Sequence, residues 1–180
     1  MNQSREEYLG LELSVFLRRQ AWKVWTWALV VSLLWVALVL LPPIAEFLDL
    51  DSLGAGLYHG FSYICHQMDD RSFHLLGHKF GVCSRCFGVY LGLLAGFVVY
   101  PFLRPVDVIE PFPRFWLFGA MIPIGIDWLL TIFGIWENTF TSRFVTGLIL
   151  GIACAVFIVP ALVEIFRLST LPKMQKRPSE

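Results

Sequence analysis

Four long apolar blocks dominate the pattern along the chain, and they lack the strict alternation that is typical of half-buried strands. The blocks span residues 24–45, 86–103, 115–136 and 144–163. Helices that cover these blocks would be about 27 to 33 Å long, which matches the roughly 30 Å hydrocarbon core of a bilayer. The pattern therefore predicts an all-α, polytopic membrane protein built as a bundle of four transmembrane helices.

Prolines stand at the ends of the first two blocks. Proline has no backbone N–H and cannot continue the hydrogen-bond ladder of a helix. Pro42 and Pro43 therefore predict the end of the first transmembrane helix. Pro105, directly after Arg104, predicts the end of the second.

Polar segments surround a membrane domain that is expected to cover residues 24–166. Residues 1–23 contain a capping box and apolar positions on one face, which predicts an amphipathic helix along the inner membrane surface. Residues 46–85 form an outer loop, in which the glycine-rich stretch 53–67 is short for a fifth span and is expected to be a re-entrant or interfacial helix. Residues 167–180 form a cytoplasmic tail.

Charge and composition add the orientation and exclude some partners. The chain is 57% hydrophobic and 16% charged, with a mean hydropathy of +0.66, which excludes a water-soluble globule. A net charge of zero offers no electrostatic footprint for a nucleic acid, so the expected partner is the lipid bilayer. With the termini inside, ten Lys and Arg lie on the inner side and four on the outer side. The positive-inside rule predicts a multi-pass protein of the plasma membrane with cytoplasmic N- and C-termini.

Reactive side chains are concentrated in the outer loop. Seven of the eight histidines and cysteines lie between residues 59 and 86. Cys83 and Cys86 form a C-x-x-C motif at the start of the second span, where the helix N-terminus favours thiolates. Cys65 lies earlier in the same loop, and His66 and His78 are the two candidates for a fourth ligand. Three thiolates and one imidazole predict a site for zinc or a similar divalent metal.

Two classes of function stay open for this cluster. A metal site closed by four protein ligands would be structural, whereas an open position could activate water to act on a lipid-linked or small substrate. Alternatively, Cys83 and Cys86 could cycle between dithiol and disulfide, with Cys65 as resolving thiol and a membrane quinone as electron acceptor. Bacterial disulfide-generating membrane oxidoreductases carry a second cysteine pair in another outer loop, and residues 137–143 contain no cysteine. The sequence does not identify a substrate.

Asp127 is an ionisable carboxylate inside the third apolar block. An unpaired charge in a membrane costs at least about 2.5 to 3.5 kcal/mol, so Asp127 requires a partner or a function. Arg143, at the outer start of the fourth block, is the expected cation, with Arg85 and Arg71 as competitors. Asp127, Arg143 and Arg71 are therefore the candidate catalytic residues beside the cysteines.

Small residues repeat every four positions on two of the predicted helices. Gly88, Gly92 and Gly96 form one stripe, and Gly147, Gly151 and Ala155 form the other. Such stripes let helix backbones approach closely in lipid, either within one chain or between two copies in a homo-oligomer.

Several short motifs together resemble a known family. The chain is similar to domain of unknown function 2085, a family of small prokaryotic integral-membrane proteins, over about residues 60–151. This resemblance implies the membrane fold and the site positions, but no activity. Phe87 and Trp128 depart from the pattern, which often has a small residue or threonine, and a glycine, at these positions. The matching motifs are Cys-His-Gln (65–67), Arg-Ser-Phe (71–73), Gly77-His78, Val-Cys-Ser-Arg-Cys (82–86), Gly88, Tyr90, Gly92, Ile126-Asp127, Glu137-Asn138, Arg143, Thr146-Gly147 and Gly151.

Overall fold

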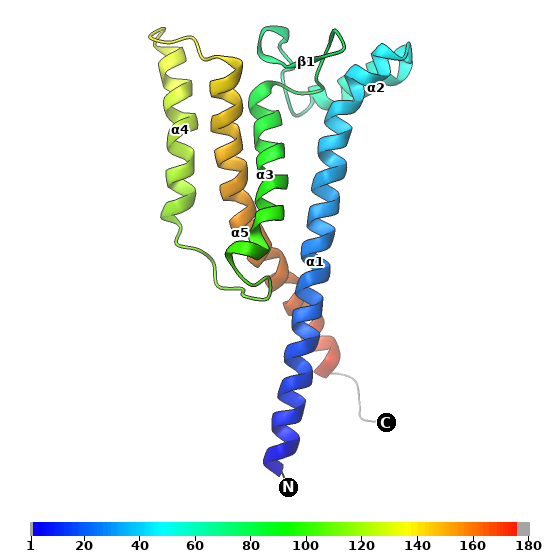
Figure 1. The fold of residues 1–180 in the computed structure, drawn as a ribbon, viewed down its shortest axis with the longest axis vertical. Coiled ribbons are helices and arrows are strands. Elements are labelled where there is room, and N and C mark those ends of the chain that lie inside the picture. Colours follow the sequence, from blue (N-terminus) through cyan, green and yellow to red (C-terminus); the bar gives the residue numbers. More distant parts are fainter. Residues whose placement is uncertain (1, 176–180) are drawn as a thin grey trace.

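A computed structural model describes the backbone of residues 2–175 and the side chains of residues 10–170. The described residues form five α-helices, one short 3₁₀ helix and one two-stranded hairpin (Figure 1). In chain order the elements are α1 (Asn2–Phe47), α2 (Asp51–Ser62), η1 (Asp69–Arg71), β1 (His74–Leu75), β2 (His78–Lys79), α3 (Ser84–Leu103), α4 (Phe115–Ile132) and α5 (Phe140–Gln175).

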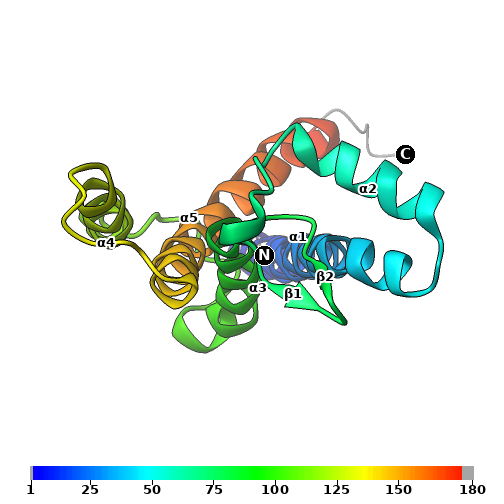
Figure 2. The same cartoon turned by 90° about the horizontal axis from the view of Figure 1, so that it is seen from above.

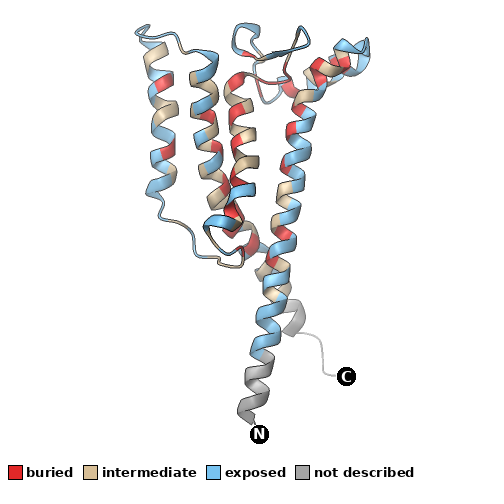
Figure 3. Ribbon diagram, viewed as in Figure 1, coloured by how far each residue is buried: buried red, intermediate tan, exposed pale blue. Residues whose placement is uncertain are grey.

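Four of these helices are long and apolar enough to cross a membrane, and they run side by side in Figure 1. The candidate spans are Gly10–Phe47, Ser84–Leu103, Phe115–Ile132 and Phe140–Thr170. Seen from above, α1, α3 and α5 lie together while α4 stands at the edge beside α5 (Figure 2). The expected all-α architecture with four long apolar candidate spans is confirmed. Many residues along the spans are exposed (Figure 3), and large apolar residues are prominent among them, as expected for surfaces that face lipid.

The first helix is longer than the sequence indicates. Pro42 and Pro43 lie inside α1, which continues to Phe47, so the prediction that they end the span is wrong. Pro43 has no N–H for the carbonyl of Val39, four residues earlier, but the loop amide of Gly81 donates to that oxygen at 3.2 Å. A distant segment thus supplies the N–H donor that proline lacks, and the helix continues past both prolines. The predicted amphipathic segment 1–23 is likewise continuous with the span in a single helix.

The small-residue stripes join α3 to α5. A Cβ atom added at Gly92 would lie less than 3.0 Å from the backbone of Leu148, and one at Gly151 would overlap the backbone of Val89. The two helix backbones therefore approach as closely as the stripes predict. Because each stripe is covered by the other within one chain, neither is available for the homo-oligomer contact that the sequence left open.

The third and fourth spans have different limits from those predicted. The helix α4 ends at Ile132 instead of residue 136, and α5 begins at Phe140 instead of residue 144. Gly134 adopts a φ of 65° after α4, where Ile135 N–H donates to Leu130 O in a Schellman-type ending. Asp127 is therefore about 7.5 Å from the end of its helix, at about 1.5 Å per residue. At the other end, α5 extends through much of the predicted tail to Gln175.

The loop between the first two spans is structured. The stretch expected to be re-entrant or interfacial forms α2, which lies outside the four candidate spans and turns away from the end of α1 (Figure 1). The hairpin β1–β2 was not predicted, and its turn places Leu76 and Gly77 at φ of 55° and 88°. Two positive φ values in a two-residue turn are typical of a type I′ hairpin. Together these elements cover one end of the bundle.

Candidate functional site

Three cysteines meet at the end of the bundle that carries α2 and the hairpin. The Sγ atoms of Cys65, Cys83 and Cys86 all lie within 4.8 Å of one another. Cys83 is the N-cap residue of α3 and Cys86 lies in its first turn, so one helix start presents both sulfurs. Cys65 follows α2, and its sulfur accepts a hydrogen bond from the backbone N–H of Cys83 at 3.2 Å. The predicted meeting of the loop cysteine with the C-x-x-C motif is thus present in the structure.

All three sulfurs are free thiols and are at least partly shielded from solvent. Cys65 is only 6% exposed and belongs to an apolar cluster with Val39, Phe61 and Val82. Hydrogen bonds from the Cys65 and Cys86 side chains, and from backbone amides of the first turn of α3, hold the pKa of the Cys83 thiol well below its usual range. The site therefore favours a thiolate, which is the form that binds metals. Three such close cysteines could form a metal site.

The loop that carries Cys65 is held in place by Gln67. Its side-chain amide donates to Tyr58 O and to Gly81 O, both at 2.8 Å. One side chain thereby ties the end of α2 to the segment that enters α3. This bridge explains how Cys65, which is distant from Cys83 in the sequence, is kept beside it.

The four histidines lie in different surroundings. His66 is exposed and lines a cavity of about 390 Å³ together with Cys65, Cys83, Cys86 and Arg71. The other predicted ligand, His78, pairs instead with Glu46 at the end of α1, with Nδ1 and Oε2 2.9 Å apart. Within the described part of the chain, no histidine nitrogen lies within 4.8 Å of all three sulfurs. His59 and His74 contact Tyr63 and Asp69, and Cys154 lies apart in α5.

The membrane carboxylate has a different partner from the one expected. Asp127 is 7% exposed, and its Oδ2 accepts a hydrogen bond from Arg85 Nη2 at 2.5 Å. Asn138 Nδ2 donates to the same oxygen at 2.9 Å. Arg143 Nε donates to Asn138 Oδ1 at 2.6 Å, so Arg143 reaches the carboxylate only through the amide. The expected direct pair between Asp127 and Arg143 is wrong, because Arg85 from the first turn of α3 fills that position.

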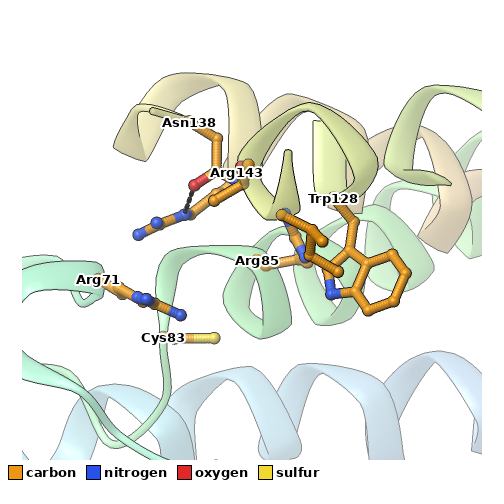
Figure 4. A pocket seen from close by; sticks show the side chains of 8 residues that line it. Arg71, Cys83, Arg85, Trp128, Asn138 and Arg143 are labelled. Carbon is orange, nitrogen blue, oxygen red and sulfur yellow. Dashed lines mark hydrogen bonds between the residues drawn. The ribbon is translucent and has the colours of Figure 1, made fainter. Parts of the chain in front are cut away.

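A second cavity, of about 280 Å³, lies against this network (Figure 4). Its wall contains all three arginines that the sequence offered as partners for Asp127. Cys83 and Arg71 line both this cavity and the one beside His66, so the two cavities adjoin. Its lining includes Arg71, Cys83, Arg85, Trp128, Asn138 and Arg143.

Three residues of the site were missed by the interpretation of the sequence. Asn138, Gln67 and Glu46 make the contacts that orient Asp127, the Cys65 loop and His78. Asn138 and Gln67 were present in the motifs of the resemblance, which was a usable signal. For Glu46 the signal in the sequence was weaker: it is a charged residue directly after an apolar block.

Comparison with known proteins agrees with this description. The model of the family described as "Predicted membrane protein (DUF2085)" matches residues 65–157, which include the three clustered cysteines, Asp127 and Arg143. The chain belongs to the DUF2085 family. Its fold is thus that of a multi-pass membrane protein by both family and helix composition.

Two archaeal relatives support the assignment to DUF2085. The "Uncharacterized protein MJ1492" of Methanocaldococcus jannaschii is 41% identical over 108 residues, which are 60% of this chain and 69% of the relative. An "Uncharacterized protein" of Methanothermobacter thermautotrophicus is 43% identical over 96 residues, which are 53% of this chain and 85% of the relative. No solved structure matches the chain.

Proposed function

We propose that this protein binds one zinc-type divalent ion through the thiolates of Cys65, Cys83 and Cys86 at the extracytoplasmic membrane face. The observation that carries the proposal is the set of three free sulfurs within 4.8 Å of one another. Metal binding would release the thiol protons, and the bound divalent cation would balance the negative charge of the three resulting thiolates. Sulfur ligands in this number select zinc over magnesium or calcium.

The fourth coordination position distinguishes a structural site from a reactive one. No described histidine joins the three sulfurs, and the cavity of about 390 Å³ borders all three cysteines. We propose that this position is open to water or substrate, with His66 on the cavity wall as the nearby imidazole. Zinc enzymes keep such an open position, whereas structural zinc sites are closed. The arrangement therefore supports a metal-dependent membrane enzyme that acts on a lipid-linked or small substrate, rather than a structural metal site in a membrane scaffold.

Asp127 takes a positioning role in this proposal. Its carboxylate is occupied by Arg85 and Asn138. A carboxylate that already accepts two such hydrogen bonds is a poor general base, but it fixes the guanidinium that it binds. Arg85, and through Asn138 also Arg143, are held at the cavity wall in this way.

The proposed orientation rests on charge. The start of α1 and the last turns of α5 lie at one end of the bundle, and the start of α3, which carries Cys83 and Cys86, lies at the other (Figure 1). Counted along the sequence, ten Lys and Arg belong to the terminal segments and the loop between α3 and α4, against four in the segments near the cysteines. This bias favours cytoplasmic termini in the plasma membrane.

Metal analysis of the purified full-length protein tests the proposal. We expect about one zinc per chain, as four-coordinate sites bind one ion. Cys65→Ser, Cys83→Ser and Cys86→Ser should each lose it, while the matched control Cys154→Ser should keep it. Alkylation of the thiols before and after reduction gives the second readout. A metal-free protein whose cluster thiols react only after reduction would contradict the proposal and favour the thiol–disulfide oxidoreductase with its quinone.

A further inference from the structure

Arginines from three separate segments converge on the cavity of about 280 Å³ (Figure 4). Arg71 comes from the end of η1, Arg85 from the first turn of α3 and Arg143 from the first turn of α5. We propose that this cavity binds a phosphoryl group. The inference deepens the proposed function, on which it rests for its link to chemistry, because Cys83 lines the cavity beside the arginines.

The positive charge of the cavity is incompletely balanced by the protein. Arg85 is paired with Asp127, and Arg71 makes only a long contact of 3.4 Å with the exposed Asp70. Arg143 is bound to the neutral amide of Asn138 and has no carboxylate partner among the residues with described side chains. The two carboxylates therefore leave an excess of one positive charge at the cavity wall. An anion would complete this balance.

Hydrogen-bond donors are left over as well. The Nε atom of Arg85 is buried and has no partner. A buried donor without a partner costs about 1 to 3 kcal/mol, so such groups are normally satisfied by a neighbour, water or ligand. Arg143 uses Nε for Asn138, which leaves its terminal nitrogen atoms for a ligand. The cavity is thus lined by guanidinium groups that keep N–H donors without a protein partner.

Two of the arginines are held in place by hydrogen bonds before any ligand arrives, and the backbone beside the third is anchored. Asp127 and Asn138 orient Arg85 and Arg143 through the chain of hydrogen bonds described above. The loop of Arg71 is anchored by Phe73, whose ring centroid lies 5.8 Å from that of Phe144 on α5. Preorganised donors lose little conformational entropy on binding. This favours recognition of a specific group over loose attraction of anions.

A phosphoryl group fits this set of donors better than other anions. Guanidinium groups bind phosphate and carboxylate oxygens with paired N–H donors, and three of them can serve the several oxygens of one phosphoryl group. The phosphoryl group could belong to free phosphate or to a lipid headgroup. A lipid could reach the cavity because two apolar residues of its wall on α4, Trp128 and Ile132, are 55% and 57% exposed. Cys83 at the same wall would place a phosphoryl oxygen near the proposed metal.

Binding of inorganic phosphate to the purified full-length protein, measured by titration calorimetry, tests the inference. Arg71→Gln and Arg143→Gln should each weaken binding about tenfold, because each removes charge-assisted hydrogen bonds. The matched control is Arg114→Gln, an exposed arginine at the opposite end of α4, which should leave binding unchanged. Arg71 is exposed, so Arg71→Gln keeps the test valid even where Arg143→Gln does not fold.

A second arm separates the sources of the phosphoryl group. The protein is mixed with phosphatidylcholine vesicles that contain or lack phosphatidic acid, and the same variants are compared. Binding that depends on Arg71 and Arg143 with phosphate identifies a free phosphate site, and binding only with phosphatidic acid identifies a lipid headgroup site. Either result supports the inference. No binding of either probe, or equal binding by the parent and both variants, would overturn it.

Both arms are run with metal-loaded and chelator-treated protein. Arginine-dependent binding by a protein that takes up no zinc on metal loading would support the phosphoryl site and contradict only the proposed metal centre. Metal without arginine-dependent binding would contradict only the phosphoryl site. The two failures are therefore distinguishable.

Discussion

Replacement of Asp127 by asparagine removes the carboxylate that pairs with Arg85. Asparagine keeps the shape of the side chain and can still accept a hydrogen bond, so the change mainly deletes the negative charge. Asp127 is 7% exposed and Arg85 is 24% exposed, which leaves the guanidinium with little access to water. We therefore expect Asp127→Asn to destabilise the fold.

The magnitude follows from the burial of the pair. Removal of one partner from a buried ion pair costs about 3 to 5 kcal/mol, mainly because the other charge is left uncompensated. Arg85 is partly exposed, so the lower end of the range applies, at about 3 kcal/mol. The double variant with Arg85→Gln should recover about 1 to 3 kcal/mol of that loss, as directly coupled residues do. Arg143→Gln should recover less, since Arg143 contacts Asn138 and not Asp127.

Unfolding of the purified variants by a denaturing detergent, in a background of mild detergent micelles, provides the assay. The two double-mutant cycles share Asp127→Asn and differ only in the arginine, so each serves as the control for the other. Asp127→Asn with unchanged stability would refute the reasoning. A coupling of Asp127 with Arg143 as large as that with Arg85 would also refute it.

Three further predictions concern other parts of the chain. Gly92→Ala should destabilise by about 1 to 3 kcal/mol, because its Cβ would overlap the Leu148 carbonyl, whereas Gly119→Ala, with nothing within 4 Å, should not; equal melting temperatures would contradict this. Burial, with a smaller effect of Glu46, raises the pKa of Tyr58 from 10.0 to about 12. The stability of the parent relative to Tyr58→Phe should therefore be constant below pH 10 and fall as the pH rises toward 12, in an alkaline unfolding series. Reporter tags at the N-terminus and in the Gly77 turn should give opposite signals, and equal signals would refute the proposed orientation.

The four spans could be predicted because length and apolarity alone decide whether a helix can cross a bilayer. The close contact of α3 and α5 was readable in part, since the stripes of small residues predicted a close helix contact but left open whether it forms within one chain or between two copies. The ends of helices were less predictable where a residue distant in the sequence determines whether the helix continues. The amide of Gly81, which is far from Pro43 in the sequence, donates to the carbonyl that Pro43 leaves without a partner, and α1 continues past its prolines. By contrast, Gly134 was a local stop signal for α4 that the interpretation of the sequence overlooked.

The candidate site also has a part that local sequence predicts and a part that depends on contacts between distant segments. The C-x-x-C motif at a helix start brings Cys83 and Cys86 together through local geometry, so this part of the cluster was predictable. The choice between three arginines for Asp127 was not, because it depends on how α3 and α4 lie relative to each other. The hairpin that carries His78 toward Glu46 has strands of only two residues, which leave no periodic pattern in a sequence.

The central claim is a metal held by three cysteine sulfurs with one open position. X-ray absorption spectroscopy at the zinc edge, on the purified full-length protein, tests it most directly. We predict three sulfur neighbours at about 2.3 Å and one nitrogen or oxygen neighbour at about 2.0 Å. A spectrum without sulfur neighbours, or a protein without metal whose cluster cysteines are joined in a disulfide, would contradict the claim.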